Sequence, residues 1–206
     1  MNRLIIFTRY PEPGKTKTRL IPALGAEGAA NLQRKLTEET VAKARQLSGV
    51  FPVSVEVRFA GGNLQLMESW LGSDLNYQEQ DIGDLGDRMR LAFETTFKTI
   101  FKTAINSGIQ RAIIIGTDCP GLNLEILQQA FENLEENDLV LGPAEDGGYY
   151  LIGLRRSIPE LFRGINWGTA EVLEKTVAMA KNLDLAISYL PQLPDLDRPE
   201  DLWILE

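Results

Sequence analysis

Histidine is absent from this sequence of 206 residues, and cysteine occurs only once. The absence of histidine excludes a Ser-His-Asp triad, a Cys-His pair and the usual His-rich zinc sites. Any metal must therefore be held by oxygen ligands, which favours Mg²⁺ or Mn²⁺ as the cofactor. The single Cys119 cannot form an internal disulfide, which fits a reducing cytoplasm. With no histidine to activate it, Cys119 is better explained as a small buried residue than as a nucleophile.

Long hydrophobic runs are missing as well. No stretch approaches the roughly 20 apolar residues that a membrane helix needs, so we expect no transmembrane segment. The first apolar run stops at Arg9, which is too short for a secretory signal and predicts a strand instead. We therefore expect a cytoplasmic protein. Nothing in the composition indicates an oligomeric state.

The net charge of −8 is unevenly distributed. An acidic protein repels a long phosphate backbone, so we expect no nucleic-acid partner. A local basic patch can still hold the phosphates of one nucleotide. The first 20 residues form such a patch, because Glu12 is their one acidic residue and five are basic: Arg3, Arg9, Lys15, Lys17 and Arg19.

Short β-branched runs alternate with longer amphipathic stretches along the whole chain. This alternation predicts one α/β domain over residues 1–206, with three α/β/α layers and a mostly parallel, mixed sheet. We expect strands at 3–8, 52–60, 75–80, 111–116, 138–142, 149–154 and 185–190. We expect helices at 27–47, 63–71, 85–107, 123–135 and 169–181, and a short one beginning at Pro199.

Ligands of open α/β sheets bind outside the carboxyl ends of the strands, so polar residues just after the apolar runs are the candidates for function. The first such group is the Pro- and Gly-shaped loop after residue 8, which has neither Walker A nor GxGxxG spacing. It is explained equally well as an exposed basic loop or as a phosphate site. The nucleotide-binding candidates here are Thr8, Arg9, Gly14, Lys15, Lys17 and Arg19.

Asp118 follows the fully apolar run RAIII and precedes a Pro-Gly turn. A carboxylate at this point could project into the ligand crevice and hold a magnesium ion shared with phosphates. It could equally well only order the turn, since aspartate is a common turn former.

Two later segments place further carboxylates after strands. Asp146 lies in GPAEDGG. Its neighbours Glu145, Gly147 and Gly148 have two explanations: they contact a substrate, or the glycines serve only positive-φ turns. Asp195 and Asp197 follow the last expected strand. Since Pro199 suits the first helical position, Arg198 takes the cap, and these two aspartates are not explained as caps and could complete a metal site.

A weaker candidate lies at the start of the expected helix 85–107. Free N–H groups at that end could receive an anion or a polar edge of a sugar or base, with Gly86 and Arg88 as the candidates. Acidic residues near a helix start are ordinary, so a purely structural role for this stretch is favoured about two to one.

Taken together, these stretches resemble the GT-A, or nucleotide-diphospho-sugar transferase, fold. FTRYPEPGKTKTRL, DLGDRM, IGTDCPGL, GPAEDGGYYLIGL and LDRPEDL resemble the bacterial DUF2064 family, some members of which are named arsenosugar-biosynthesis glycosyltransferases. More distantly, the chain is similar to 2-phospho-lactate and molybdenum-cofactor guanylyltransferases. The resemblance implies that Asp118 is the chief metal ligand, with Asp197 or Asp195 completing the site. The LxGGxGxR loop of many sugar nucleotidyltransferases is replaced by Pro-Glu-Pro-Gly, while Lys15 and Arg19 keep the basic pair.

The expected function is therefore metal-dependent transfer of a sugar from a nucleotide-diphospho-sugar to a small acceptor. Mg²⁺ or Mn²⁺ on Asp118, with Lys15 among the basic residues, would stabilise the leaving diphosphate, and Asp146 would position or deprotonate the acceptor hydroxyl. One alternative is nucleotidyl transfer to a phosphorylated small molecule with release of pyrophosphate. Another is a non-catalytic nucleotide-binding module.

Overall fold

The computed structural model describes residues 1–98 and 108–205. A seven-stranded sheet has the strand order β3-β2-β1-β4-β6-β5-β7. The strands are β1 (Asn2–Arg9), β2 (Val53–Ala60), β3 (Asn76–Glu79), β4 (Arg111–Ile115), β5 (Leu139–Pro143), β6 (Tyr149–Leu154) and β7 (Ile187–Tyr189). The α-helices are α1 (Ile21–Val50), α2 (Leu64–Leu71), α3 (Leu85–Lys98), α4 (Leu124–Asn133) and α5 (Val172–Asn182). Short 3₁₀ helices lie at η1 (Thr18–Leu20), η3 (Pro159–Phe162) and η4 (Pro199–Leu205).

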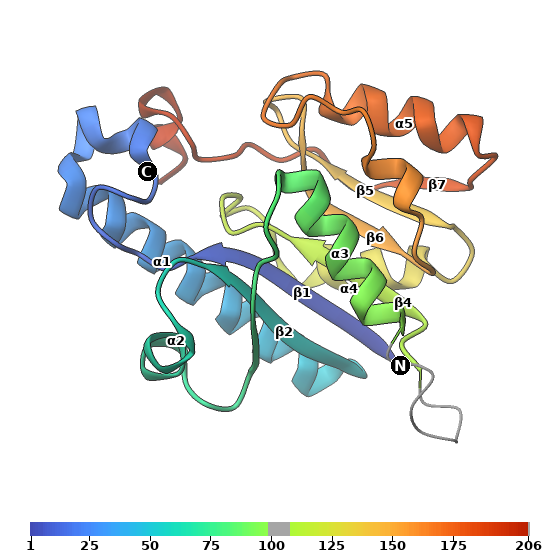
Figure 1. Cartoon of the computed structure of the whole chain (residues 1–206), viewed down its shortest axis with the longest axis horizontal. Helices are drawn as coiled ribbons and strands as arrows, with labels where there is room; N and C mark the ends of the chain where they lie inside the picture. Colours follow the sequence, from blue (N-terminus) through green and yellow to red (C-terminus); the bar gives the residue numbers. More distant parts are fainter. Residues whose placement is uncertain (99–107, 206) are drawn as a thin grey trace.

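The sheet is mixed and mostly parallel, as the alternation of strands and helices predicted. β1 pairs in parallel with both β2 and β4, whereas β6 runs antiparallel to its neighbours β4 and β5. The carboxyl ends of every strand except β6 therefore meet along one edge (Figure 1). This edge is where an open α/β sheet binds ligands.

Helices cover both faces of the sheet and make the predicted three layers (Figure 1). One apolar cluster packs α1, α2 and α4 against the sheet, with Leu4, Ile6 and Ile113 among its fully buried members. The second cluster packs α3 and α5 on the opposite face around Ile5 and Phe93. Successive residues of β1 thus enter opposite clusters, the period-2 pattern expected of a strand covered on both sides.

The element boundaries differ from the expected ones mainly at helix starts. α1 begins at Ile21, inside the stretch expected to be loop, because Pro22 suits the first turn of a helix. Gly25, with φ 70° and ψ 169°, kinks it soon afterwards. α5 begins at Val172 rather than at residue 169. Of the helix expected at 85–107, residues 99–107 lie outside the described part of the chain.

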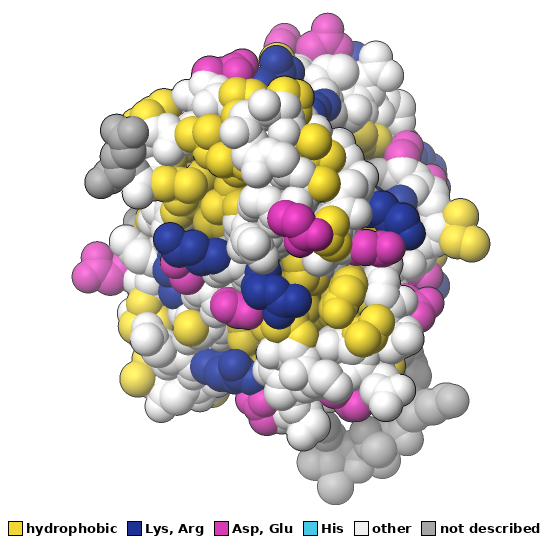
Figure 2. Space-filling view, turned by 90° about the vertical axis from the view of Figure 1, so that its left-hand side faces the viewer, with side chains coloured by type: hydrophobic (Ala, Val, Ile, Leu, Met, Phe, Trp, Pro, Cys, Tyr) yellow, Lys and Arg dark blue, Asp and Glu magenta, His cyan; other side chains and the backbone are white. Residues whose placement is uncertain are grey.

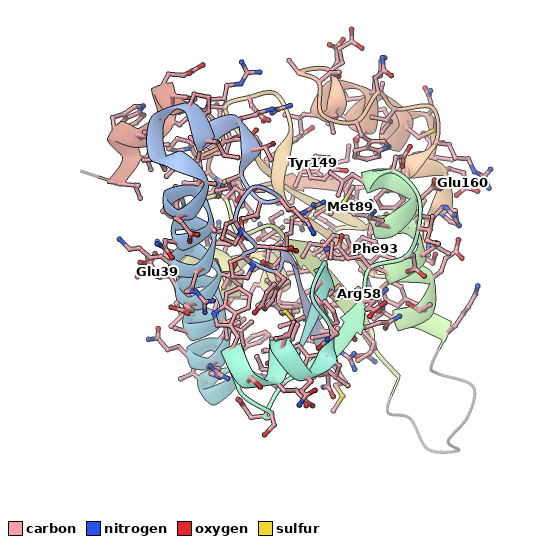
Figure 3. The ribbon with its side chains drawn as sticks, turned by 60° about the vertical axis from the view of Figure 1, so that its left-hand side comes forward. Glu39, Arg58, Met89, Phe93, Tyr149 and Glu160 are labelled. Carbon is pink, nitrogen blue, oxygen red and sulfur yellow. The ribbon has the colours of Figure 1, made fainter. Side chains whose placement is uncertain are left out.

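A buried ionic network lies between the sheet and α3. Glu56 on β2 accepts hydrogen bonds from Arg58 and Arg3, the Arg58 bond measuring 2.6 Å. Arg58 also donates to the hydroxyl of Thr95 on α3 at 2.8 Å, and its side chain is only 2% exposed (Figure 3). Such a network is costly to break, because a partner left alone remains charged away from water.

None of the helices in residues 1–98 and 108–205 is long and apolar enough to cross a lipid bilayer.

Candidate functional site

Loops from distant parts of the sequence meet at the carboxyl edge of the sheet. They contain residues 10–20, 80–84, 116–123, 144–148 and 190–198. Figure 2 faces this edge and shows acidic and basic side chains interspersed with apolar ones. The loop after β1 supplies the basic side chains, and the loops after β4, β5 and β7 supply the acidic ones.

Lys17 joins three of these loops. Its ammonium donates hydrogen bonds to Oδ1 of Asp118 at 2.8 Å and to the carbonyl of Leu196 at 2.6 Å. The N–H of Leu196 in turn donates to the carbonyl of Asp118 at 2.8 Å. The side chain of Lys17 is only 3% exposed, so the carboxylate of Asp118 serves as the counter-ion of a buried cation. The amino-terminal loop, the β4 loop and the carboxyl-terminal segment are thereby fastened together.

The backbone at Lys17 is left-handed, with φ 43° and ψ 46°. This conformation costs a non-glycine residue about 1 kcal/mol or more, and residues held in it cluster at functional sites. The hydrogen bonds of the ammonium explain why the conformation persists. Earlier in the same loop, Gly14 has a φ of 79°, which glycine adopts without strain because it has no Cβ.

A second ion pair links the same segments of chain. The guanidinium of Arg19 donates a hydrogen bond to Oδ2 of Asp197. Asp201 accepts hydrogen bonds from the N–H groups of Asp197 and Arg198, at 3.0 and 2.7 Å, as the third residue of a capped helix does. The capping role at η4 thus belongs to Asp201 rather than to Asp195 or Asp197.

Buried polar side chains join the ends of the strands that precede two of these loops to α1. The hydroxyls of Thr8 and Thr37 lie 2.8 Å apart, and the amide of Gln33 donates to Thr8 at 3.1 Å and to Thr117 at 3.3 Å. All four side chains are buried. They fix the ends of β1 and β4 to α1, so Thr8 has a structural role here. Gln33 and Thr37 were not predicted, although a polar residue on the buried face of an expected helix is a usable signal.

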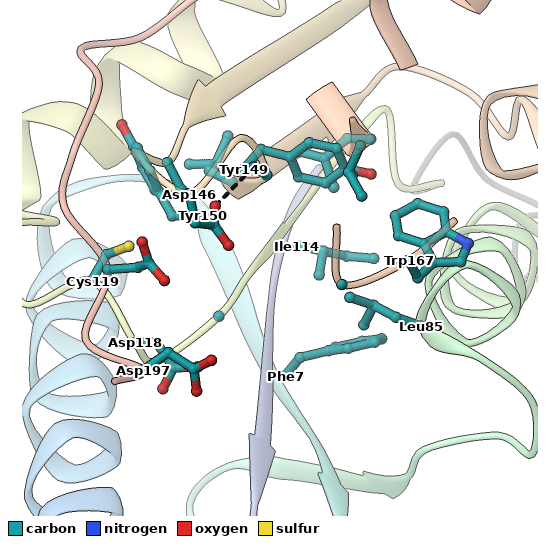
Figure 4. Close-up of a pocket in the computed structure, with 18 of the residues that line it drawn as sticks. Phe7, Leu85, Ile114, Asp118, Cys119, Asp146, Tyr149, Tyr150, Trp167 and Asp197 are labelled. Carbon is teal, nitrogen blue, oxygen red and sulfur yellow. Dashed lines mark hydrogen bonds between the residues drawn. The ribbon is translucent and has the colours of Figure 1, made fainter. Parts of the chain in front are cut away.

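A cavity of about 350 Å³ opens beside the two ion pairs, and we call it the chamber. Its two sides differ in chemistry (Figure 4). The acidic side carries four carboxylates, those of Asp118, Asp146, Asp195 and Asp197, together with Arg19. The apolar side includes Phe7, Leu85, Ile114, Tyr149 and Trp167. The carboxylate of Asp146 accepts a hydrogen bond from the N–H of Gly148 at 2.8 Å, which fixes its orientation.

Two further cavities continue this chamber into a groove. The next one, of about 290 Å³, shares Asp118 and Asp197 with the chamber. Its cationic lining residues are Arg9, Lys17 and Arg88. A third cavity, of about 420 Å³, continues past Arg88 and is lined by residues 59–62 and 79–83.

The carboxylates of the chamber repel one another. Partial burial and then the nearby Asp146 raise the pKa of Asp195 to about 6, with smaller effects from Asp201 and Asp197. Burial, followed by the charges of Asp118, Asp195 and Asp146, raises the pKa of the Cys119 thiol far above its usual range. Cys119 is 8% exposed, so the prediction that it is buried is confirmed.

Asp195→Asn is expected to raise the melting temperature at pH 7.5 in EDTA. The raised pKa means that the ionised carboxylate is less stable in the folded chain than in the unfolded one. After discounting for solvent screening, we expect a gain of about 1 kcal/mol, or roughly 2–4 °C. The gain should shrink as the pH falls through about 6, where the folded-state carboxyl becomes protonated, and should vanish below about 4, where the carboxyl is protonated in both states. A gain that is absent, or the same at every pH, would contradict this explanation; calorimetry across pH measures it.

The donor set at this edge fits Mg²⁺ or Mn²⁺, because it consists of carboxylate oxygens. Within residues 1–98 and 108–205, no three histidine, cysteine, aspartate or glutamate side chains form a ready-made metal cluster. Asp118 and Asp197 instead pair with Lys17 and Arg19. Burial and then the negative charge of Asp146 raise the pKa of Asp195, and a divalent cation bound beside these carboxylates would offset both effects.

Other predicted residues lie at the margin of the groove. Lys15 pairs with Glu12 at 2.7 Å, is 69% exposed and lines neither the chamber nor the second cavity. Glu145 is exposed on the rim, beside the carboxyl-terminal segment. Arg88 donates to the carbonyl of Gly83 at 3.0 Å and so orders the start of α3.

The segment from residue 164 to 171 explains two of the predicted glycines, Gly86 and Gly147. A Cβ on Gly86 would lie 2.2 Å from Nε1 of Trp167, and one on Gly147 would lie 2.3 Å from the carbonyl oxygen of Ala170. Both glycines thus allow this segment to pack onto the site. The sequence analysis missed Trp167; a tryptophan directly before Gly168, between an expected strand and an expected helix, was the available signal.

Comparisons with known proteins show which family and fold the chain resembles. Residues 40–169 match the family model described as "Uncharacterized protein conserved in bacteria (DUF2064)". A crystal structure from Desulfovibrio desulfuricans G20, named "putative nucleotide-diphospho-sugar transferase", is 32% identical with a TM-score of 0.88. That match covers 99% of this chain and 85% of the other. No curated protein matches the sequence.

More distant structures share only the fold. Rv0371c from Mycobacterium tuberculosis H37Rv, crystallised with manganese, is 12% identical with a TM-score of 0.59, covering 99% of this chain and 97% of that one. A CMP:2-keto-3-deoxy-manno-octonic acid synthetase complexed with CTP is 11% identical with a TM-score of 0.56, covering 99% and 96%. The predicted nucleotide-diphospho-sugar transferase fold is confirmed.

Proposed function

The chain belongs to the bacterial DUF2064 family, and we propose that it is a metal-dependent enzyme that transfers a sugar from a nucleotide-diphospho-sugar to a small acceptor. One observation carries the proposal. The ion pairs Lys17–Asp118 and Arg19–Asp197 lie where the chamber joins a cation-lined cavity, with Asp195 and Asp146 beside them. The 32% identity to a protein named as such a transferase supports it.

In this proposal the diphosphate of the donor lies in the second cavity. Arg9 and Arg88 can bind phosphate oxygens through their planar guanidinium groups, and Lys17 contributes a buried point charge. The nucleoside extends into the third cavity, beside the start of α3, where Gly86 belongs to the first helical turn. The sugar then enters the chamber, and the bond to be broken lies near Asp118.

Asp118, with Asp195 or Asp197, would hold Mg²⁺ or Mn²⁺. When bound, the ion supplies neutralisation of the charge that develops on the leaving diphosphate. Lys17 adds to this stabilisation from a fixed position, as a preorganised cation must. Arg19 is 57% exposed and can turn from Asp197 towards a phosphate oxygen when the donor enters.

Asp146 faces the acceptor in this proposal. The N–H of Gly148 holds its carboxylate at the chamber wall. From there it can accept the proton of an acceptor hydroxyl as that oxygen attacks the sugar. Gly148 lines the chamber beside it, while Glu145 and Gly147 complete the turn.

The test is turnover of a panel of UDP-, GDP-, CDP- and dTDP-sugars with Mg²⁺ or Mn²⁺. We expect release of the nucleoside diphosphate from one donor class, with water as a slow acceptor, and a metal-dependent rise in melting temperature with the same donor. No turnover of any donor, together with no metal-dependent binding, would refute sugar transfer.

The two loop lysines give a matched pair of variants for that assay. Lys17→Met is expected to lower kcat/KM by at least about tenfold, because it removes a buried cation beside the phosphates. Lys15→Met should have a smaller effect, since Lys15 is exposed and paired with Glu12. Equal losses in the two variants would contradict the special position given to Lys17.

Nucleotidyl transfer is the second candidate. Three cationic side chains line the second cavity, enough to hold a triphosphate, and the fold is shared with a synthetase complexed with CTP. Pyrophosphate release from GTP or CTP, dependent on a phosphorylated acceptor, would favour this reaction over sugar transfer.

A further inference from the structure

Trp167 forms a fixed aromatic platform on the apolar side of the chamber. Its ring stacks on Phe162 with centroids 6.4 Å apart and meets Tyr149 edge-on at 6.5 Å. The absence of a side chain at Gly86 lets the indole lie against the first turn of α3. Aromatic rings held in this way present a flat apolar surface to a ligand.

Figure 4 shows this platform and the carboxylates on opposite sides of the chamber. A molecule between them therefore meets an apolar ring on one side and acidic oxygens, including those of Asp146, on the other. A cavity of about 350 Å³ has room for a small molecule.

The side chains that line the chamber carry more negative than positive charge. Among its lining residues in the described part of the chain, Arg19 is the one cation, and it is paired with Asp197. Lys17 lies in the neighbouring cavity and is paired with Asp118. With the metal and Arg19 engaged by the donor diphosphate, an anionic acceptor in the chamber would face the carboxylate of Asp146 without a dedicated cation, which charge-assisted binding of a phosphate or carboxylate requires.

We propose that the acceptor is an uncharged or cationic small molecule whose flat apolar body lies on Trp167 and whose hydroxyl reaches Asp146. This inference rests on the proposed sugar transfer and adds the acceptor class to it. In the reaction, the acceptor oxygen bonds to the anomeric carbon, the bond from that carbon to the diphosphate oxygen breaks, and the hydroxyl proton passes to Asp146. The carboxylate of Asp146 weakens the binding of phosphorylated and carboxylate-bearing acceptors.

Three phenols that share a 4-hydroxyphenethyl core and differ in the terminal group test the charge rule: 4-hydroxyphenethyl alcohol, tyramine and 3-(4-hydroxyphenyl)propionate. Ligand-observed NMR measures the affinity of each phenol for the protein in the presence of Mg²⁺ and the nucleoside diphosphate. Mg²⁺ is used because paramagnetic Mn²⁺ broadens the signals. We expect the neutral and cationic probes to bind, and the anionic one to bind at least about tenfold more weakly, because like charges repel strongly at short range. Asp146→Asn should reduce the difference in affinity between the anionic probe and the other two. Equal binding of the anion would overturn the proposal.

Trp167→Ala tests the platform, with Trp70→Ala as its control. Trp70 packs on Tyr10 outside the chamber, so its loss should leave probe binding unchanged. Trp167→Ala should weaken the neutral probe about fivefold or more, and Trp167→Phe should restore part of the affinity. If Trp167→Ala fails to fold, the charge series on the unaltered protein still decides the matter. Binding that is indifferent to both Trp167 variants would overturn the platform.

Failure of this inference is distinguishable from failure of the proposed function. Donor binding and hydrolysis by water do not depend on the acceptor. If they persist while the anionic phenol binds best, the acceptor class is wrong and sugar transfer stands. If no nucleotide binds with any metal while the neutral phenol still prefers the chamber, sugar transfer fails instead.

Discussion

Asp118→Asn is expected to lower kcat/KM with the active donor by at least about 100-fold. The carboxylate lies at the junction of the chamber and the second cavity, and it is the side chain we propose as the chief metal ligand. Loss of one preorganised electrostatic contact in an active site typically costs about 3 kcal/mol or more. Steady-state kinetics over a range of Mn²⁺ concentrations measures the loss and shows whether more metal recovers any of it.

The fold should survive this change. The side chain of Asp118 is 47% exposed, and asparagine retains an oxygen that can accept the hydrogen bond of Lys17. Asp74→Asn is the control, because Asp74 is an exposed carboxylate paired with Arg45, away from the groove. Near-normal kinetics in Asp118→Asn, or an equal loss in Asp74→Asn, would remove Asp118 from the mechanism.

Glu56→Ala is expected to produce the largest loss of stability, about 3–5 kcal/mol. It leaves the buried guanidinium of Arg58 without its close carboxylate, and the remaining Asp81 oxygen lies 3.7 Å away. Removal of one partner of a buried ion pair has this cost, because the other charge stays away from water. For a chain of this length the melting temperature should fall by on the order of 10 °C. Urea unfolding followed by circular dichroism gives the free energy.

Glu56→Gln is the matched control for the charge. It keeps an oxygen that can accept from Arg58 and should lose less than the alanine variant. A double variant with leucine at both Glu56 and Arg58 should also lose less than Glu56→Ala, since apolar replacement of a whole pair is often tolerated. A loss below about 1 kcal/mol in Glu56→Ala would show that water reaches Arg58.

The strands and the edge of the site were readable from the sequence for a simple reason. Fully apolar runs such as AIII at residues 112–115 must be covered on both faces, and the residues after them must leave the sheet at its carboxyl edge. Asp118 and Asp146 follow such strands, Asp195 and Asp197 follow the edge strand β7, and the structure brings all four around one chamber.

Contacts between segments far apart in the sequence could not be predicted from local patterns. Nothing in the local pattern distinguishes Lys17 from Lys15, since both lie in one basic loop. Only the carboxyl-terminal segment, which supplies the carbonyl of Leu196, buries the first and leaves the second in solvent. Trp167 was missed for the same reason, because its contact with Gly86 joins residues about 80 apart.

Anomalous diffraction from crystals grown with Mn²⁺ and a nucleoside diphosphate tests the central claim most directly. The account predicts one strong Mn²⁺ peak within about 2.5 Å of a carboxylate oxygen of Asp118 and of either Asp195 or Asp197, with the diphosphate on its other side. The ammonium of Lys17 should lie within hydrogen-bonding distance of the same diphosphate. A diphosphate bound in the groove with no Mn²⁺ at Asp118, or Mn²⁺ found only at other carboxylates, would contradict the account.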